Sequence, residues 1–363
     1  MPAGERYVFE GALAGPSAFI HLRNWDAAGA LLRLHSSGVT GYLNEDWDST
    51  DLVALLTLVD LNEDVIHTAA RPRWWNALAL QAQSWLFGRI GTNVHAHYRL
   101  DNEFYRRWLD PSLSYSAALF DRDPARTLEQ AQVAKYERIL QALRPRPEQT
   151  VLDIGCGWGG FAQYAAAHYG CRVHGVTLSR RQVKWARERI EQSGLQRRVS
   201  IELRDFRTLT RGYDHVVSIE AYEVAGEAAW GAHFDTIARC LVEGGKAFFQ
   251  GGIIADRPLT RPRQPGGFVR THIHPTAQLA PWPVLEQHAR RAGLDVRASV
   301  IHSADYAQTL KCWRERFNAA WPELARLGLD RRFQRLWNFY LAYCEAGYRS
   351  GKTALVQAQL ARR

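Results

Sequence analysis

Residues 150–182 read TVLDIGCGWGGFAQYAAAHYGCRVHGVTLSRRQ, and this stretch decides how the chain folds. An apolar run at 151–154 ends in four glycines between 155 and 160. A helical pattern follows at 161–168, and a β-branched run follows at 172–178. This order predicts a βαβ unit whose first turn is bare backbone, so that amide groups at a helix start can face a ligand.

The residues after the glycines indicate which ligand. A nicotinamide-binding unit would carry an acidic residue at the end of its second strand, but here that strand ends in Thr177-Leu178-Ser179, followed by Gln182. With Asp153 ahead of the glycines, the stretch resembles the S-adenosylmethionine pocket of class I methyltransferases. More narrowly, it resembles the cyclopropane fatty-acid synthase family, which favours LDIGCGWGG and GVTLSxxQ. The resemblance implies an α/β, Rossmann-like fold with a mostly parallel seven-stranded sheet. The alternative interpretation is an ordinary βα turn.

Composition limits the other classes of function. The chain has 363 residues, of which 46% are apolar, enough for a sizeable core. Its five cysteines show no CxxC spacing, which suggests neither a metal site nor a disulfide framework and fits a reducing cytoplasm. The net charge of +9 is compatible with nucleic acid, anionic lipid or an acidic substrate, and we expect an anionic membrane surface as the partner. No nucleic-acid-binding motif and no membrane-spanning run stands out. We therefore expect a cytoplasmic protein at the inner face of the membrane.

Two domains are expected. Residues 1–90 predict a small, mainly helical domain with strand-like pieces at 7–13 and 19–22 and a helix at 50–60 capped by Ser49 or Thr50. Residues 91–363 predict the methyltransferase domain. Basic and aromatic residues at 71–90 fit either a membrane-docking helix or a helix packed on its own core.

Strands and helices alternate through the larger domain. Further helices are predicted at 128–143 and 234–241, the second stopped by Gly244-Gly245, with a charged helix between Gln182 and Gly194. Further strands are predicted at 199–203, 214–219 and 246–250, and residues 256–267 predict a mobile loop.

The family resemblance extends along most of the chain. Residues 97–105, HYRLDNEFY, follow the family's HYDLxNxFY, with Arg99 in place of aspartate. Tyr115-Ser116 follows its YS, but Ala117 replaces the next cysteine. Residues 218–226 follow SIEMFEAVG, and residues 305–313 and 343–349 follow its closing motifs.

The resemblance assigns a cofactor pocket. Asp153 would orient the turn or receive the amine of the cofactor's amino-acid tail, while Thr177 and Gln182 would meet the ribose diol. Asp205 would accept from the adenine amino group, with Phe206 as an aromatic wall. Taken singly, Thr177 and Asp205 also fit strand-end residues that satisfy local backbone. The full set of cofactor-binding residues is Tyr115, Ser116, Asp153, Gly155, Gly157, Gly159, Thr177, Leu178, Gln182, Asp205 and Phe206.

The resemblance also implies the chemistry. The family's acceptor is the double bond of an unsaturated phospholipid acyl chain, which attacks the sulfonium methyl and leaves a carbocation. Aromatic faces can stabilise this cation, and candidates are Tyr222, Trp230, Tyr306, Trp313 and Tyr348. A base, thought to be bound bicarbonate, then removes a proton. The family's bicarbonate ligands match Glu223 and Tyr306, with Gln250 in place of a histidine, Ala117 in place of a cysteine and Gly252 in place of an isoleucine.

Several alternatives stay open. Cys344 matches a family thiol once assigned to the active site, although a structural cysteine is the other interpretation. The product is either a cyclopropane or a methyl-branched or methylene acyl chain, and the altered bicarbonate ligands favour the branched route. A small-molecule N- or O-methyltransferase and a catalytically degenerate lipid-binding relative are the competing functions. Family members form dimers, so a homodimer is a further expectation.

Overall fold

The computed structural model describes residues 6–11, 13–23, 37–63, 65–66, 98, 100–255 and 267–363. The predicted docking helix at 71–90 and nearly all of the predicted loop at 256–267 lie outside these residues. None of the helices in the described part of the chain is long and apolar enough to cross a bilayer.

The chain divides into two compact units. The first comprises Met1–Arg99, Leu259–Pro275 and Trp321–Lys352, and the second comprises Leu100–Pro258, Thr276–Ala320 and Thr353–Arg363. Each unit is therefore built from segments that are distant in sequence. The boundary at residue 90 stays a prediction.

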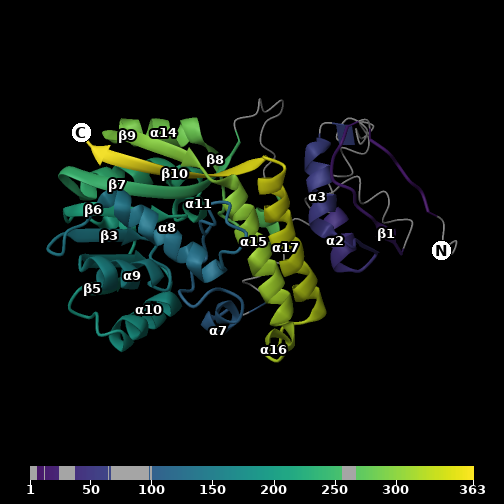
Figure 1. Ribbon diagram of the computed structural model, residues 1–363, viewed down its shortest axis with the longest axis horizontal. Helices are drawn as coiled ribbons and strands as arrows, with labels where there is room; N and C mark the ends of the chain where they lie inside the picture. Colours follow the sequence, from purple (N-terminus) through teal and green to yellow (C-terminus); the bar gives the residue numbers. More distant parts are fainter. Residues whose placement is uncertain are drawn as a thin grey trace. The chain divides into compact units, whose positions relative to one another are not determined.

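The larger, second unit contains the main sheet (Figure 1). Its strands are β3 Thr150–Ile154, β4 Arg172–Thr177, β5 Val199–Leu203, β6 Tyr213–Ile219, β7 Leu241–Ile254, β8 Ala280–Pro281, β9 Leu294–Ile301 and β10 Thr353–Arg362. The strand order is β5-β4-β3-β6-β7-β10-β9, and the short β8 pairs with β7. Strands β3 to β7 run parallel, while β10 is antiparallel to both of its neighbours. The carboxyl ends of β3 to β7 thus meet at one edge, which confirms the predicted fold class.

Helices cover both faces of this sheet. Alternating side chains of each strand enter two separate cores, so that Val151 packs with one and Leu152 with the other. The first core joins the sheet to α8 Leu128–Leu143, α9 Gly160–Tyr169 and α10 Arg180–Gln192. The second joins it to α12 Trp230–Cys240 and α14 Trp282–Arg291. The unit also contains α7 Asn102–Arg106, η1 Phe206–Thr208, α11 Tyr222–Ala225, η2 Glu227–Ala229 and α15 Ser303–Ala319.

The first unit contains a two-stranded sheet and five helices among its described residues. These elements are β1 His21–Leu22, β2 Trp47–Asp48, α2 Ser37–Leu43, α3 Leu52–Leu61, α13 Phe268–His272, α16 Trp321–Ala325 and α17 Arg331–Arg349. The buried Arg335 of α17 holds the end of α2 and strand β2 in place. Its guanidinium donates to the carbonyls of Tyr42 and Trp47 and to the carboxylate of Asp48. The side chain also lies over the Tyr42 ring, 3.8 Å from its centre.

Three local predictions were wrong. Helix α3 is capped by Asp51, whose carboxylate accepts from the Ala54 amide, and not by Ser49 or Thr50. The described part of 7–13 has no strand, and its apolar side chains are exposed, with Phe9 at 92%. Helix α12 ends at Cys240, ahead of the glycine pair, because β7 begins directly at Leu241 and includes Gly244 within the strand.

Candidate active site

The glycine turn, residues 155–160, lies at the carboxyl end of β3. Gly155 and Gly157 have φ values of +77° and +54°, a region that side-chain-bearing residues rarely adopt. A Cβ on Gly155 would lie 2.7 Å from the Cβ of Ala221, whereas a Cβ on Gly157 would meet nothing within 4 Å. Ala221 therefore excludes a side chain at Gly155, whereas Gly157 has room for one, and the backbone is exposed at Gly155 and half-buried at Gly157.

The other predicted cofactor residues follow the same sheet edge. Thr177 ends β4, and its hydroxyl donates to Oε1 of Gln182 in α10 at 2.7 Å. This pair can bind a diol, since the Gln182 amide can still donate a hydrogen bond and the Thr177 hydroxyl oxygen can still accept one. Leu178 is 67% exposed beside it. Asp205 follows β5 and is held by Arg207, whose guanidinium lowers the pKa of the Asp205 carboxyl, while Phe206 packs edge-on against His233.

Asp153 is a buried carboxyl in β3 with one oxygen, Oδ2, that has no hydrogen-bond partner among the residues that the structure describes. Burial raises the pKa of Asp153 to about 7, against the lowering effect of Lys135. A buried oxygen without a donor is costly, so a cationic or amine donor from a ligand would stabilise it. This orphan oxygen and the accessible backbone at Gly157 fit a ligand that carries an amino-acid tail.

Four polar side chains gather where β6 ends beside Gln250 of β7, and we call Glu220, Glu223, Gln250 and Tyr306 the carboxylate cluster. Glu220 accepts hydrogen bonds from the Gln250 amide at 2.8 Å and from the Tyr306 hydroxyl at 2.6 Å. Glu223, in α11, accepts from the backbone amide of Gly252 at 2.6 Å. The structure thus brings together three predicted residues, Glu223, Gln250 and Tyr306, through one that the sequence analysis did not select, Glu220.

Both acids of the cluster are perturbed. Burial raises the pKa of Glu220 and raises the pKa of Glu223 well above its usual value, and the charge of Glu220 raises that of Glu223 further. Hydrogen bonds from Tyr306 and Gln250 act in the opposite direction on the pKa of Glu220. Two neighbouring carboxyls with differently shifted pKa values are typical of sites that move protons.

A row of aromatic rings connects the cluster to the glycine turn. Tyr306 contacts Trp313 at a ring-centre distance of 6.3 Å, and Trp313 contacts Tyr115 at 5.1 Å. Tyr115 then contacts Tyr105, and Tyr105 contacts Trp158, which belongs to the glycine turn. Such faces favour a nearby cation. The remaining aromatic candidates are not part of this row: Tyr222 and Trp230 pack in the second core, and Tyr348 belongs to the first unit.

Lys135 was also missed by the sequence analysis. It is fully buried in α8 and donates to the hydroxyl of Ser116 at 2.7 Å. Burial lowers the pKa of Lys135 to about 8, and the negative charges of Glu220, Asp110 and Asp153 limit that fall. The sequence could have indicated Lys135 as a candidate, because residue 135 falls on the apolar face of the predicted helix, where an unpaired lysine is rare.

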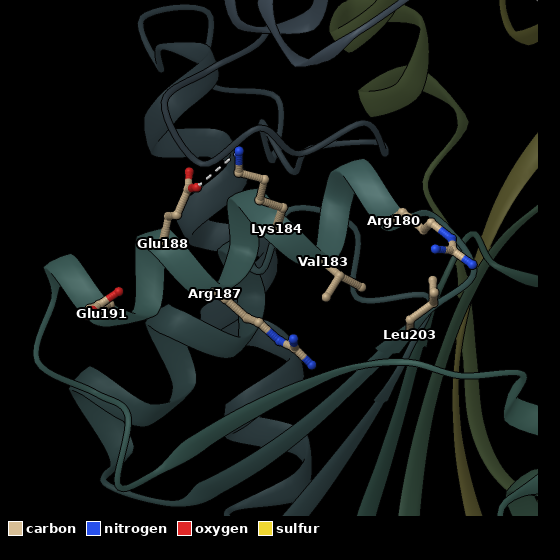
Figure 2. Close-up of a pocket in the computed structure, with 7 residues that line it drawn as sticks. All are labelled: Arg180, Val183, Lys184, Arg187, Glu188, Glu191 and Leu203. Atoms are coloured by element: carbon tan, nitrogen blue, oxygen red, sulfur yellow. Dashed lines mark ion pairs between the residues drawn. The ribbon is translucent and has the colours of Figure 1, made fainter.

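The predicted catalytic residue Cys344, like Tyr348, does not belong to the second unit. Cys344 is a half-buried residue of α17 in the first unit, so the structure does not relate it to the carboxylate cluster. The second unit also has a groove of about 430 Å³ that is not part of the predicted site. Side chains of α10, most of them charged, form most of its lining, and none of its lining residues is a predicted site residue (Figure 2). Its Lys184 and Glu188 form an exposed ion pair at 3.9 Å.

Comparison with known proteins identifies the family. The model of the family described as mycolic acid cyclopropane synthetase matches residues 89–358. The chain belongs to this cyclopropane synthase family. It is 32% identical to tuberculostearic acid methyltransferase UfaA1 of Mycobacterium tuberculosis, over 96% of this chain and 83% of that protein. It is 35% identical to cyclopropane-fatty-acyl-phospholipid synthase of Escherichia coli K12, over 78% of this chain and 70% of that protein.

A solved member of the family supports the same fold. Mycolic acid cyclopropane synthase CmaA1, in a structure complexed with SAH and CTAB, matches with a TM-score of 0.68 and 29% identity, over 74% of this chain and 97% of that one. The predictions of family, fold and S-adenosylmethionine dependence are thereby confirmed. This cyclopropane synthase relative is an S-adenosylmethionine-dependent methyltransferase that acts on lipids.

Proposed function

We propose that this enzyme methylates the double bond of an unsaturated phospholipid acyl chain and releases a methyl-branched or methylene product. The observation that carries the proposal is the position of the two carboxyl groups Glu220 and Glu223. Glu220 directly precedes Ala221 and Glu223 follows two residues after it, and the Ala221 methyl group packs against Gly155 of the glycine turn. A proton acceptor thus lies beside the turn that would hold the methyl donor.

The cofactor-binding residues fit S-adenosylmethionine, which supplies an electrophilic methyl group on a sulfonium sulfur when bound. The backbone at Gly157 allows close approach, Asp153 offers its unpartnered oxygen to the tail amine, and the Thr177–Gln182 pair offers partners for a diol. Tyr115 contributes a ring between the two ends of the site, and Ser116 is fixed by Lys135.

An alkene acceptor explains the rest of the site. An alkene needs no base before it attacks, but the cation that it leaves must lose a proton afterwards. The aromatic row from Tyr306 to Trp158 can stabilise this cation, and the carboxylate cluster can collect the proton. We favour the branched route over ring closure because Ala117, Gln250 and Gly252 stand where the family resemblance assigns a cysteine, a histidine and an isoleucine.

We further propose that the substrate is reached at the inner, cytoplasmic face of the membrane. Two observations support this: the net charge of +9, which attracts anionic lipid, and the 35% identity to a fatty-acyl-phospholipid synthase.

The test uses unsaturated phospholipid vesicles and S-adenosylmethionine carrying a trideuterated methyl group. We expect a fatty acyl product that gains one carbon and takes up hydrogen under mild hydrogenation. Retention of all three deuteriums marks a methyl-branched alkene, and retention of two marks a methylene. A product that keeps two deuteriums and resists hydrogenation is a ring, and would contradict the branched route. Vesicles of neutral lipid are the control for charge, and we expect slower turnover on them.

A further inference from the structure

The side chain of Glu220 is held on three sides. Its Oε1 accepts from the Ala117 backbone amide and from the Gln250 amide, each at 2.8 Å. Among the described residues, its Oε2 accepts only from the Tyr306 hydroxyl, at 2.6 Å. These donors come from three segments far apart in sequence, so a carboxylate is recognised here by the fold as a whole and not by one local turn.

The backbone of Glu220 is equally specific. Its φ of +52° lies in the left-handed region, which costs a residue with a side chain about 1 kcal/mol or more. The conformation is secured by the Glu220 amide, which donates to the carbonyl of Gln250 at 2.8 Å. Glycine would adopt it without strain, yet this chain places an acid there and directs it into a set of hydrogen-bond donors.

The hydrogen bonds leave one acceptor position vacant. A carboxylate oxygen has two lone pairs, so Oε1 is satisfied by its two donors and Oε2 retains one lone pair. Gln250 cannot titrate, and its own oxygen accepts from Gln357 at 2.7 Å, which fixes the direction of its amide. The residue Glu220 is only partly buried, which is compatible with a substrate at the vacant acceptor position of Oε2.

The charges around the cluster indicate which acid is ionised. Lys135 is a buried positive charge that lowers the pKa of Glu220, and the three hydrogen-bond donors to Glu220 lower it as well. Glu223 has a single amide donor, and the charge of Glu220 raises its pKa. Burial raises the pKa of both groups, but two adjacent carboxylates resist simultaneous ionisation, and the donors around Glu220 favour the charge on Glu220 over Glu223.

We infer that Glu220 is the proton acceptor of the methyl transfer, acting through Oε2 in place of a free anion such as bicarbonate. The inference rests on the proposed function. The π electrons of the substrate alkene form the new carbon–carbon bond to the methyl group as its bond to sulfur breaks, and that electron pair stays on sulfur. Glu220 then takes a proton from a carbon next to the cationic centre, and the released C–H pair forms the new π bond.

The donors that the family resemblance assigns to bicarbonate agree with this inference. The Ala117 amide, Gln250 and Tyr306 all bind Glu220, and the Gly252 amide binds Glu223. A side-chain carboxylate therefore already occupies the hydrogen bonds that a small bound anion would need. The chain supplies its own base at a fixed position, which would determine which proton is removed.

The first experiment needs no variant. Turnover of the wild-type enzyme on unsaturated phospholipid vesicles is measured in buffer stripped of carbon dioxide, with and without added bicarbonate. We expect the two rates to agree within about twofold, since the acceptor is part of the chain. A rate that depends on bicarbonate would overturn the inference.

The second experiment compares Glu220→Gln with Glu223→Gln. Glu220→Gln keeps an acceptor for the Ala117 amide but cannot take a proton, so turnover should fall by about 100-fold or more. Glu223→Gln resembles a neutral acid and should lose no more than about tenfold. Binding of SAH, measured by calorimetry, should stay within about threefold in both, which shows that they fold. A larger loss in Glu223→Gln would transfer the role to that residue.

Chemical rescue distinguishes a proton acceptor from a residue that only positions Tyr306. Glu220→Gly suits the left-handed backbone and opens a space lined by three donors. Added formate or bicarbonate should raise its turnover by about tenfold, while equal chloride should not. Glu188→Gln, at the exposed pair with Lys184, is the control and should keep wild-type turnover. An inactive wild type that still binds SAH would remove the proposed function and this inference together, whereas an active Glu220→Gln would remove the inference alone.

Discussion

The glycine turn and the carboxylate cluster lie at the same edge of the sheet but are built in different ways. The turn is contiguous in sequence, at residues 155–160, and its backbone conformation is set locally. The cluster is assembled from β6, α11, β7 and α15, and the Ala117 amide completes it. The comparison teaches that the part which binds the common cofactor is local, while the part that determines the product depends on the whole unit.

The strongest test of this contrast is Gly155→Ala, because Gly155 is where the two regions touch. The new Cβ would lie 2.7 Å from Ala221, between the two acids, and the φ of +77° adds strain. We expect a loss of about 2–4 kcal/mol in the free energy of unfolding, measured by denaturant titration. Turnover should fall with it, since both regions are displaced.

Gly157→Ala is the matched control for the same substitution. Its φ of +54° is also left-handed, but a Cβ there meets nothing within 4 Å. We expect only the strain, about 1 kcal/mol, together with weaker SAH binding because the Cβ occupies the accessible side of the turn. Equal destabilisation by the two variants would show that Ala221 does not pack against the turn, and the contrast would lose its structural basis.

The second test is Tyr306→Phe, which removes one donor from the carboxylate cluster. A hydrogen bond to a charged group contributes about 1.5–3 kcal/mol, so turnover at saturating cofactor should fall by about 10- to 150-fold. SAH binding should be unchanged, because the Tyr306 hydroxyl contacts Glu220. Calorimetry and steady-state rates on vesicles would measure the two quantities.

Gln182→Ala should give the opposite result. It removes the partner of the Thr177 hydroxyl at the end of β4. We expect SAH affinity to fall by about 5- to 10-fold and the saturated rate to stay near wild type. If Tyr306→Phe weakened SAH binding or Gln182→Ala lowered the saturated rate, the two regions would not be separable.

The same contrast explains what the sequence could predict. Helix α8 and strand β5 have the predicted bounds, because their periodicity and flanking residues are local signals. The glycine turn could be placed for the same reason. Strand β7 was predicted only at 246–250 but extends over Leu241–Ile254, since pairing with β6 and β10 extends it beyond its own apolar run.

Glu220 was missed because its partners are distant in sequence. Tyr306 lies 86 positions away and Ala117 lies 103 positions away, so no spacing rule connects them. One signal was nevertheless present. Glu220 directly follows β6, at the edge of the parallel sheet where ligands of such folds bind.

The smallest expected effect concerns stability against pH. Because the pKa of Glu223 is raised in the folded chain, folding takes up a proton at any pH between the usual glutamate value and the raised one. Stability from this group is complete below the usual value and is lost as pH rises, with a slope of at most about 1.4 kcal/mol per pH unit. Glu223→Gln removes this titration. Denaturant unfolding between pH 5 and pH 8 should therefore show the wild type losing more stability than the variant.

A control for this slope is Glu188→Gln, which removes an acid from an exposed ion pair on α10 and leaves the carboxylate cluster intact. Its stability should decline with pH in parallel with the wild type. If Glu223→Gln also declined in parallel, Glu223 would be ionised in the folded chain at neutral pH. Glu220 and Glu223 would then share the charge, and the separation of one ionised acceptor from one neutral partner would not hold. A flatter slope for Glu223→Gln alone would place the neutral acid in α11 and leave the charge on Glu220.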